Sequence, residues 1–349
     1  MFKGLKFLAA AAALSLSLGA AAHADTKIQG AGATFPAPLY AKWVEAFNKA
    51  HPDLQVDYQA IGSGGGIKGI TDRTVQFAGS DAPMTTDQEK SAPAKLLHIP
   101  TVAGPEVLIY NLPTVKGLKL NNDIVAGIFL GEITNWNDAK IKALNPTASL
   151  PNQDILVAHR SDGSGTTYIF TDYLSKVSDT WKSKVGAATS VKWPTGVGGK
   201  GNDGVAAAVA NADGAIGYVE FAFAQKKSLQ YATQINKAGK EVAPTIDNIN
   251  ASAATIKEFP ADMKVSITNA DGDNAYPICG YTYILVYQDM SYLADKAKAQ
   301  AVVDYINWCV HDGQDMAKSL GYAKLAPEIQ KKVEAELKTI TCDGQPLLK

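Results

Sequence analysis

Short strand-like runs alternate with helix-like stretches along nearly the whole chain. The strand-like runs are rich in Val, Ile, Tyr and Phe and end at Gly, Pro, Asn or Asp, whereas the helix-like stretches repeat apolar residues at spacings of three and four. This alternation predicts an α/β fold of layered helices and sheet, and it argues against a β-sandwich or a helical bundle. We expect strands at residues 27–29, 54–60, 76–79, 97–100, 107–112, 155–160, 215–219 and 278–287, and helices at 39–47, 67–73, 123–130, 168–177, 204–211, 295–310 and 327–338.

The first 24 residues have the pattern of an export signal rather than of a folded segment. A basic start with Lys3 and Lys6 precedes an apolar run, and the small residues Ala22 and Ala24 stand before an expected cleavage site. A membrane anchor is the alternative, but the run is rich in Ala, Ser and Gly and is of marginal length for a span. We therefore expect residues 1–24 to be a signal peptide and the remainder to be exported.

The length and charge of the chain limit the domain organisation and the function classes. At roughly 100–200 residues per domain, a chain of 349 residues predicts two domains, and no Ser/Pro-rich linker separates them. We therefore expect strands shared between two lobes, with crossovers near residues 100–105 and 278–287 that divide the exported chain into lobe I (25–104 and 277–349) and lobe II (105–276). The formal net charge is −1 and no Lys/Arg block stands out, which argues against non-specific nucleic-acid binding, since this needs a basic face.

Three glycine-rich segments each follow an expected strand and open an expected helix: residues 30–36, 62–66 and 162–167. Free backbone N–H groups and the positive end of the helix dipole make such starts good anion sites. Any one of them alone is better explained as an ordinary helix cap, but three together, with Arg160 beside the third, favour a ligand site. The planar guanidinium matches phosphate or carboxylate oxygens. Asp162 is expected to hold it, although a surface Arg–Asp pair of little energetic value is the alternative.

Asp81, in the segment 78–83, ends another short apolar strand. A carboxylate in an anion pocket is favourable only if the anion carries a proton to donate, as phosphate does at neutral pH and sulfate does not. An ionised Asp81 would therefore accept a hydrogen bond from phosphate and repel sulfate. The alternative is an N-cap for the turn that follows.

The sequence lacks the P-loop, the nucleophile elbow of α/β-hydrolases and paired metal-ligand histidines. The segment 196–201 lacks the spacing and hydroxyl of a P-loop, no Gly-x-Ser-x-Gly surrounds Ser63 or Ser164, and the histidines show no metal-ligand spacing. We therefore expect no enzyme, no cofactor and no metal. Whether two of the three cysteines (Cys279, Cys309 and Cys342) form a disulfide, or all three are buried thiols, stays open.

With these residues in view, the chain resembles the periplasmic phosphate-binding proteins of bacterial phosphate-specific ABC transporters. The resemblance implies a two-lobed periplasmic binding protein of type II topology with phosphate in the cleft between the lobes. It further implies a monomer in the periplasm that delivers phosphate to ABC permease subunits in the inner membrane. The segments that carry it are residues 30–38, 61–66, 78–83 and 160–167, and, outside the expected pocket, 193–204 and 214–220.

Residue by residue, the resemblance implies a phosphate site with Asp162 as the partner of its arginine. One departure is Gly64, where relatives often have a second serine. An exported phosphatase, a surface adhesin that keeps the fold, and a receptor for another oxyanion such as molybdate or sulfate are the alternatives. The implied phosphate-binding residues are Thr34, Phe35 (through its backbone N–H), Ser63, Asp81, Arg160, Ser164, Gly165 (backbone) and Thr166.

Overall fold

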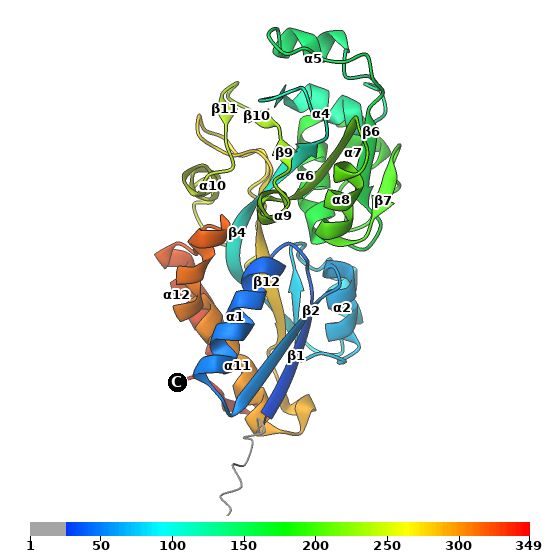
Figure 1. Ribbon diagram of the computed structural model, residues 1–349. Helices are drawn as coiled ribbons and strands as arrows, with labels where there is room; N and C mark the ends of the chain where they lie inside the picture. Colours follow the sequence, from blue (N-terminus) through cyan, green and yellow to red (C-terminus); the bar gives the residue numbers. More distant parts are fainter. Residues whose placement is uncertain (1–25) are drawn as a thin grey trace, which may run out of the picture.

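The computed structural model describes residues 26–349, so the signal peptide expected at residues 1–24 lies outside the described residues. The fold has two lobes, one above the other in Figure 1, and two long strands run between them. These strands are β4 (Leu96–Tyr110) and β12 (Cys279–Tyr287), both buried along their whole length. They pair antiparallel to each other, and this pair connects the strands of the lower lobe with those of the upper lobe.

One mixed sheet passes through both lobes. In the lower lobe β1 pairs parallel with β2 and β3, and β12 joins β3 antiparallel. In the upper lobe β8 pairs antiparallel with β4 and parallel with β6. The strand order is β2 (Leu54–Ala60), β1 (Thr26–Gly32), β3 (Phe77–Ser80), β12, β4, β8 (Ala215–Glu220), β6 (Leu156–Arg160) and β7 (Val197–Gly199), with β9 (Gln230–Tyr231) also on β4. Two small sheets join β5 (Lys119–Leu120), β10 (Thr233–Ile235) and β11 (Glu241–Val242), and β13 (Thr341–Cys342) and β14 (Gln345–Pro346).

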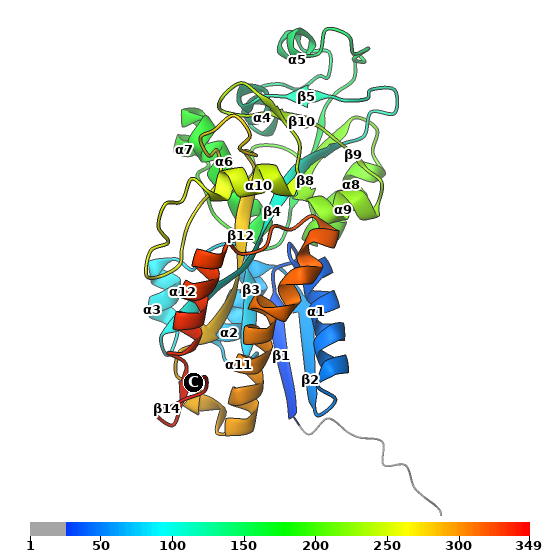
Figure 2. The ribbon, with the colours of Figure 1, turned by 90° about the vertical axis from the view of Figure 1, so that its left-hand side faces the viewer.

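Helices cover both faces of each half of this sheet. In the lower lobe α1 and α11 lie on one face and α2 on the other, as Figures 1 and 2 show from two sides. In the upper lobe α6 and α8 both pack against β8. The helices are α1 (Ala37–Ala50), α2 (Ser63–Thr71), α3 (Thr86–Ser91), α4 (Asn122–Phe129), α5 (Ala139–Leu144), α6 (Gly165–Val177), α7 (Asp179–Lys184), α8 (Gly201–Ala210), α9 (Phe221–Lys226), α10 (Ile246–Ala253), α11 (Lys296–Val310) and α12 (Pro327–Leu337), with 3₁₀ turns at Ser291–Leu293 and Asp312–Leu320.

The expected helices and strands are present, with two instructive differences. The expected strands 97–100 and 107–112 are parts of the single strand β4, which therefore runs through Pro100 and Pro105. Proline cannot donate to a ladder, but the pairing of β4 with β12 shifts register beside Pro100, and a bulge tolerates the missing donor. The helix expected from residue 67 begins instead at Ser63, so the glycine-rich segment forms its first turn.

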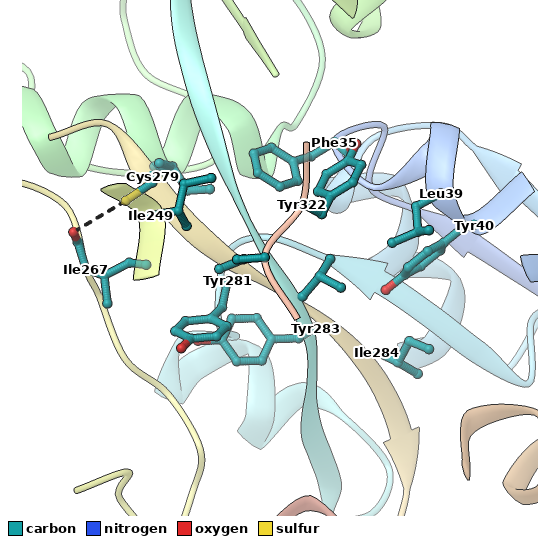
Figure 3. Close-up of a cluster of buried hydrophobic side chains, with 14 of the residues drawn as sticks. Phe35, Leu39, Tyr40, Ile249, Ile267, Cys279, Tyr281, Tyr283, Ile284 and Tyr322 are labelled. Carbon is teal, nitrogen blue, oxygen red and sulfur yellow. Dashed lines mark hydrogen bonds between the residues drawn. The ribbon is translucent and has the colours of Figure 1, made fainter. Parts of the chain in front are cut away.

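Aromatic side chains form a buried cluster beside the paired strands β4 and β12 (Figure 3). Tyr281 and Tyr283 of β12 lie there with Phe35 and Tyr322, and all four side chains are buried. The Tyr322 hydroxyl donates to the Phe35 carbonyl at 2.7 Å, so the aromatic core also fixes the backbone at the start of α1.

The cysteine alternatives that the sequence left open are settled by the structure. All three cysteines are free and buried. The Cys279 thiol donates to the Tyr276 carbonyl at 3.2 Å, and burial raises the pKa of this thiol to about 12. No helix within residues 26–349 is both long and apolar enough to cross a membrane.

Candidate functional site

The second and third glycine-rich segments meet in direct contact between the lobes. The Gly165 N–H donates to the Ser63 hydroxyl oxygen at 3.0 Å, although the two residues are 102 positions apart. Beside this contact the Gly64 N–H donates to the Gly163 carbonyl at 2.9 Å. The start of α2 in the lower lobe therefore lies against the start of α6 in the upper lobe.

Close packing of these two turns explains the glycine at position 64. A Cβ added at Gly64 would lie 3.0 Å from the Gly163 Cα, which is tighter than nearly all real Cβ contacts. A serine here would push the facing backbone away, so the glycine allows the two turns to approach more closely than a side chain would.

Asp81 lies at the same junction, at the end of β3. Its backbone N–H donates to the Ser63 hydroxyl at 3.2 Å, and the Thr282 hydroxyl of β12 donates to its Oδ1 at 2.7 Å. The side chain is only 2% exposed. Burial raises the pKa of Asp81 to about 7, against the lowering effects of the Thr282 hydrogen bond and the Arg160 charge. The carboxyl group therefore changes charge near neutral pH.

Arg160 ends β6 and is 3% exposed. Its Nε and Nη2 donate to the two Asp162 oxygens at 2.8 and 2.6 Å, and its Nη1 donates to the Thr166 hydroxyl at 3.1 Å. Burial opposes ionisation of Asp162, but the Arg160 hydrogen bonds and charge hold the pKa of that carboxyl below its usual range. The pair is a fixed, bidentate one, and among the described residues these contacts use three of the five guanidinium N–H donors.

The hydroxyl groups of the site share one hydrogen-bonding role: each accepts a hydrogen bond from a neighbouring N–H group. Ser164 caps α6 by accepting from the Thr167 N–H at 3.0 Å. The Thr166 hydroxyl accepts from Arg160 and from Asn202, and the Thr34 hydroxyl accepts from Asn202 at 2.8 Å. A hydroxyl that accepts in this way keeps its own O–H for donation, so the Thr34, Ser164 and Thr166 hydroxyls present donors. The Ser63 O–H instead donates to Asp81 Oδ2 at 3.5 Å.

Sequence reasoning missed Asn202, because the segment 193–204 was placed outside the expected pocket. That placement was wrong for Asn202, whose amide links Thr34 of the lower lobe to Thr166 of the upper lobe and whose Oδ1 accepts from the Glu220 N–H at 2.9 Å. A signal was present, since Gly201 and Asn202 follow strand β7 and open α8 in the same strand-to-helix pattern as the other three turns.

A metal site and a large cavity are the other candidates to consider within residues 26–349. No group of three or more His, Cys, Asp or Glu side chains there is placed to hold a metal ion. A cavity of about 1060 Å³ does lie elsewhere, between α10 and α12, lined by residues such as Ile246, Phe259 and Leu325. None of the buried charged side chains lines it.

Comparison with known proteins agrees with this geometry. The sequence profile of the PBP superfamily domain matches residues 19–312. The chain is 44% identical to the phosphate-binding protein PstS of Pasteurella multocida, over 92% of this chain and 93% of that protein. It is 42% identical to the PstS protein of Haemophilus influenzae, over 93% of this chain and 96% of that protein. The chain belongs to the PstS family.

Solved structures support the PstS fold. A periplasmic phosphate-binding protein, PfluDING, bound with phosphate superposes with a TM-score of 0.70 at 23% identity, over 88% of this chain and 93% of that one. A putative phosphate ABC transporter substrate-binding protein from Clostridium perfringens gives 0.63 at 18% identity, over 86% and 100%. These likenesses confirm the expected α/β, two-lobed architecture of a periplasmic binding protein.

Replacing Gly165 by alanine is expected to disrupt the junction in this PstS protein. The added Cβ would lie 2.3 Å from Asp81 Oδ2 and 2.5 Å from Ser63 Oγ, so the Asp81 and Ser63 side chains, or the turns that carry them, must shift. We expect the affinity for phosphate, the ligand named for the PstS relatives, to fall at least about fivefold when measured by calorimetry, since this shift disturbs contacts worth about 1 kcal/mol or more. Gly69→Ala in α2 is the matched control, because its nearest neighbours lie at an ordinary 3.4 Å. Equal affinities for the two variants would contradict the close contact.

Proposed function

We propose that this PstS-family protein is a receptor for inorganic phosphate, which it binds between its lobes and delivers to an ABC-type permease. The relatives named above are phosphate-binding proteins, and two solved structures of the same fold contain phosphate. The residues proposed to contact phosphate are Thr34, Phe35, Ser63, Asp81, Arg160, Ser164, Gly165 and Thr166, with Asp162 holding the arginine.

The convergence of donors at one junction carries this proposal. Hydroxyls from both lobes and the start of α6 gather around a buried guanidinium that is already oriented by Asp162. A chain with a formal net charge of −1 cannot attract a dianion by its overall field, so oriented local dipoles and one buried cation must hold it. In a water-poor site such groups interact far more strongly than they do in bulk water.

Closure of the lobes supplies that water-poor environment in the proposed mechanism. Lobe I would comprise residues 25–104 and 277–349 and lobe II residues 105–276, with β4 and β12 as the connections that flex. Contacts across the junction, such as Gly165 to Ser63 and Asn202 to Thr34, would form on closure. The proposed role is binding without turnover by a monomer exported to the periplasm, and the names of the relatives support the binding part of it.

Isothermal titration calorimetry of the chain from residue 25 tests the proposed function. We expect one phosphate per chain, because the donors form a single junction. Incubation with a phosphate ester should release no phosphate with or without a chelator, since the proposed role is binding alone. Absence of heat on phosphate addition, or steady release of phosphate from the ester, would contradict the proposal.

A further inference from the structure

Besides Asp81, the acidic residue Glu106 of β4 is buried. Glu106 lies directly opposite Glu220 of β8 in the antiparallel pairing, and both side chains are fully buried. Residues directly opposite in such a pair point to the same face of the sheet. Two like charges in this position would repel strongly in a dry interior, so the pair is unfavourable as two carboxylates.

The two acids have different partners. The Glu220 oxygens accept from the Ala222 N–H at 3.1 and 3.0 Å and cap α9. Within residues 26–349 neither Oε1 nor Oε2 of Glu106 has a hydrogen-bond partner. A buried carboxylate without donors is the costlier of the two to ionise. Burial raises the pKa of Glu220 as well, but Glu220 has N–H donors for its oxygens, so Glu106 is the member of the pair that is harder to ionise.

Glu106 shares its side of the sheet with the groups that hold Arg160. Tyr218 lies two residues before Glu220 on β8 and therefore on the same face. The Tyr218 hydroxyl accepts from the Arg160 backbone N–H at 3.1 Å and contacts the Thr167 hydroxyl at 2.6 Å. This contact joins the face that carries Glu106 to the start of α6 and the guanidinium.

The charged groups that act on Glu106 are Asp81 and Arg160 of the site and the neighbouring Glu220. Burial, the most important effect, raises the pKa of Glu106 well above its usual value; Asp81 and Glu220 raise it further, and Arg160 lowers it. Other groups facing it are neutral near pH 7, because burial raises the pKa values of Tyr218, Tyr276 and Cys279. The Tyr276 hydroxyl donates to the Glu106 carbonyl at 2.9 Å.

We propose that Glu106 is a positioning residue that controls how strongly Arg160 attracts phosphate. As a neutral acid, Glu106 leaves the positive charge of Arg160 available to the ligand. As a carboxylate, it offsets that charge and repels the ligand. The inference rests on the proposed phosphate-binding function. Arg160 already has one carboxylate partner in Asp162, with Asp81 as a second nearby acid. A further negative charge in this dry region would weaken the field that Arg160 directs at an anion and would repel the anion itself.

This role predicts that phosphate affinity depends on the protonation of Glu106, which a purely structural role would not produce. A bound anion favours the neutral acid, so the ligand raises the pKa of Glu106 further and binding becomes coupled to its proton. Above the pKa of the ligand-free protein, the affinity of the wild type then falls with rising pH by up to tenfold per unit, relative to a variant that cannot ionise at this position.

The experiment measures phosphate dissociation constants for wild type, Glu106→Gln and Glu106→Leu across the pH range from mildly acidic to alkaline. We expect similar constants at low pH and a wild-type to variant ratio that grows at alkaline pH. Leucine serves as the second variant because it fills the space without adding a buried amide. Glu45→Gln removes an exposed carboxylate from α1 and should track the wild type throughout.

Each outcome decides the inference. Persistence of the rising ratio in an Asp81→Asn background would support Glu106 as its source, whereas its loss there would assign the effect to Asp81 and overturn the proposal. A ratio that stays flat with pH, while phosphate still binds, would overturn it as well.

Infrared spectroscopy gives a readout independent of binding: a protonated carboxyl band should vanish in Glu106→Gln, and an unchanged spectrum would contradict a neutral Glu106. Failure of wild type to bind phosphate at any pH would instead contradict the function.

Discussion

Replacing Arg160 by alanine is expected to weaken phosphate binding by about 3–5 kcal/mol, or roughly a hundredfold to several thousandfold in Kd, because it removes a desolvated charge-assisted contact. Ser63→Ala removes one neutral hydroxyl donor and should cost about 1 kcal/mol. Arg160 is buried and held rigidly by both oxygens of Asp162, so its donors are already oriented before the ligand arrives. Calorimetric titration of the two variants measures the difference.

The Arg160 comparison needs a control for the partner that the substitution leaves behind. Asp162 would keep its negative charge in Arg160→Ala and could itself repel phosphate. The double variant Arg160→Ala, Asp162→Asn removes that charge, and we expect it to recover only part of the lost affinity. Equal losses for Arg160→Ala and Ser63→Ala, or full recovery in the double variant, would contradict the role given to the guanidinium.

Replacing Asp81 by asparagine is expected to admit sulfate. Above its pKa of about 7, the Asp81 carboxylate can accept a hydrogen bond from a protonated anion but repels one that has no proton. An opposed like charge costs several kcal/mol, so sulfate affinity at mildly alkaline pH should rise at least about a hundredfold in Asp81→Asn. Competition of sulfate against phosphate in wild type and variant provides the measurement.

The pH dependence of the wild type should follow the same logic. Because burial raises the pKa of Asp81, the neutral acid is populated as the pH falls through about 7, and the repulsion of sulfate then fades. Sulfate affinity of the wild type should therefore increase toward acidic pH, while that of Asp81→Asn should lack this step. Asp57→Asn, which removes an exposed carboxylate of the same lobe, is the control. If Asp81→Asn still excludes sulfate at alkaline pH, Asp81 does not determine the selectivity for phosphate over sulfate.

Features with local causes could be predicted from the sequence. The strand at residues 54–60 has the bounds of β2, and the apolar spacing of Leu39, Tyr40, Trp43 and Phe47 marks the buried face of α1. The convergence of the glycine-rich turns also followed, since each ends a strand of the same α/β sheet. The first two features depend on residues close together in the chain, whereas the convergence depends on the sheet topology, since Ser63 and Gly165 are 102 positions apart.

Features that depend on distant partners could not be predicted in the same way. Asn202 contacts Thr34 across 168 positions, and Thr282 contacts Asp81 across 201, so neither role is visible in its own neighbourhood. Glu106 stands in a strand-forming run where nothing local indicates that it faces another acid. The single strand β4 likewise depends on its pairing with β12, whose register shift lies beside Pro100.

The most direct test of the central claim is a crystal structure of the protein grown with inorganic phosphate. We expect one phosphate between the lobes, with its oxygens accepting hydrogen bonds from Arg160 and from the starts of α1, α2 and α6, and one of its oxygens within hydrogen-bond distance of the Asp81 carboxylate. A phosphate bound instead in the cavity between α10 and α12, or one that leaves Arg160 and Asp81 without contact, would contradict the account.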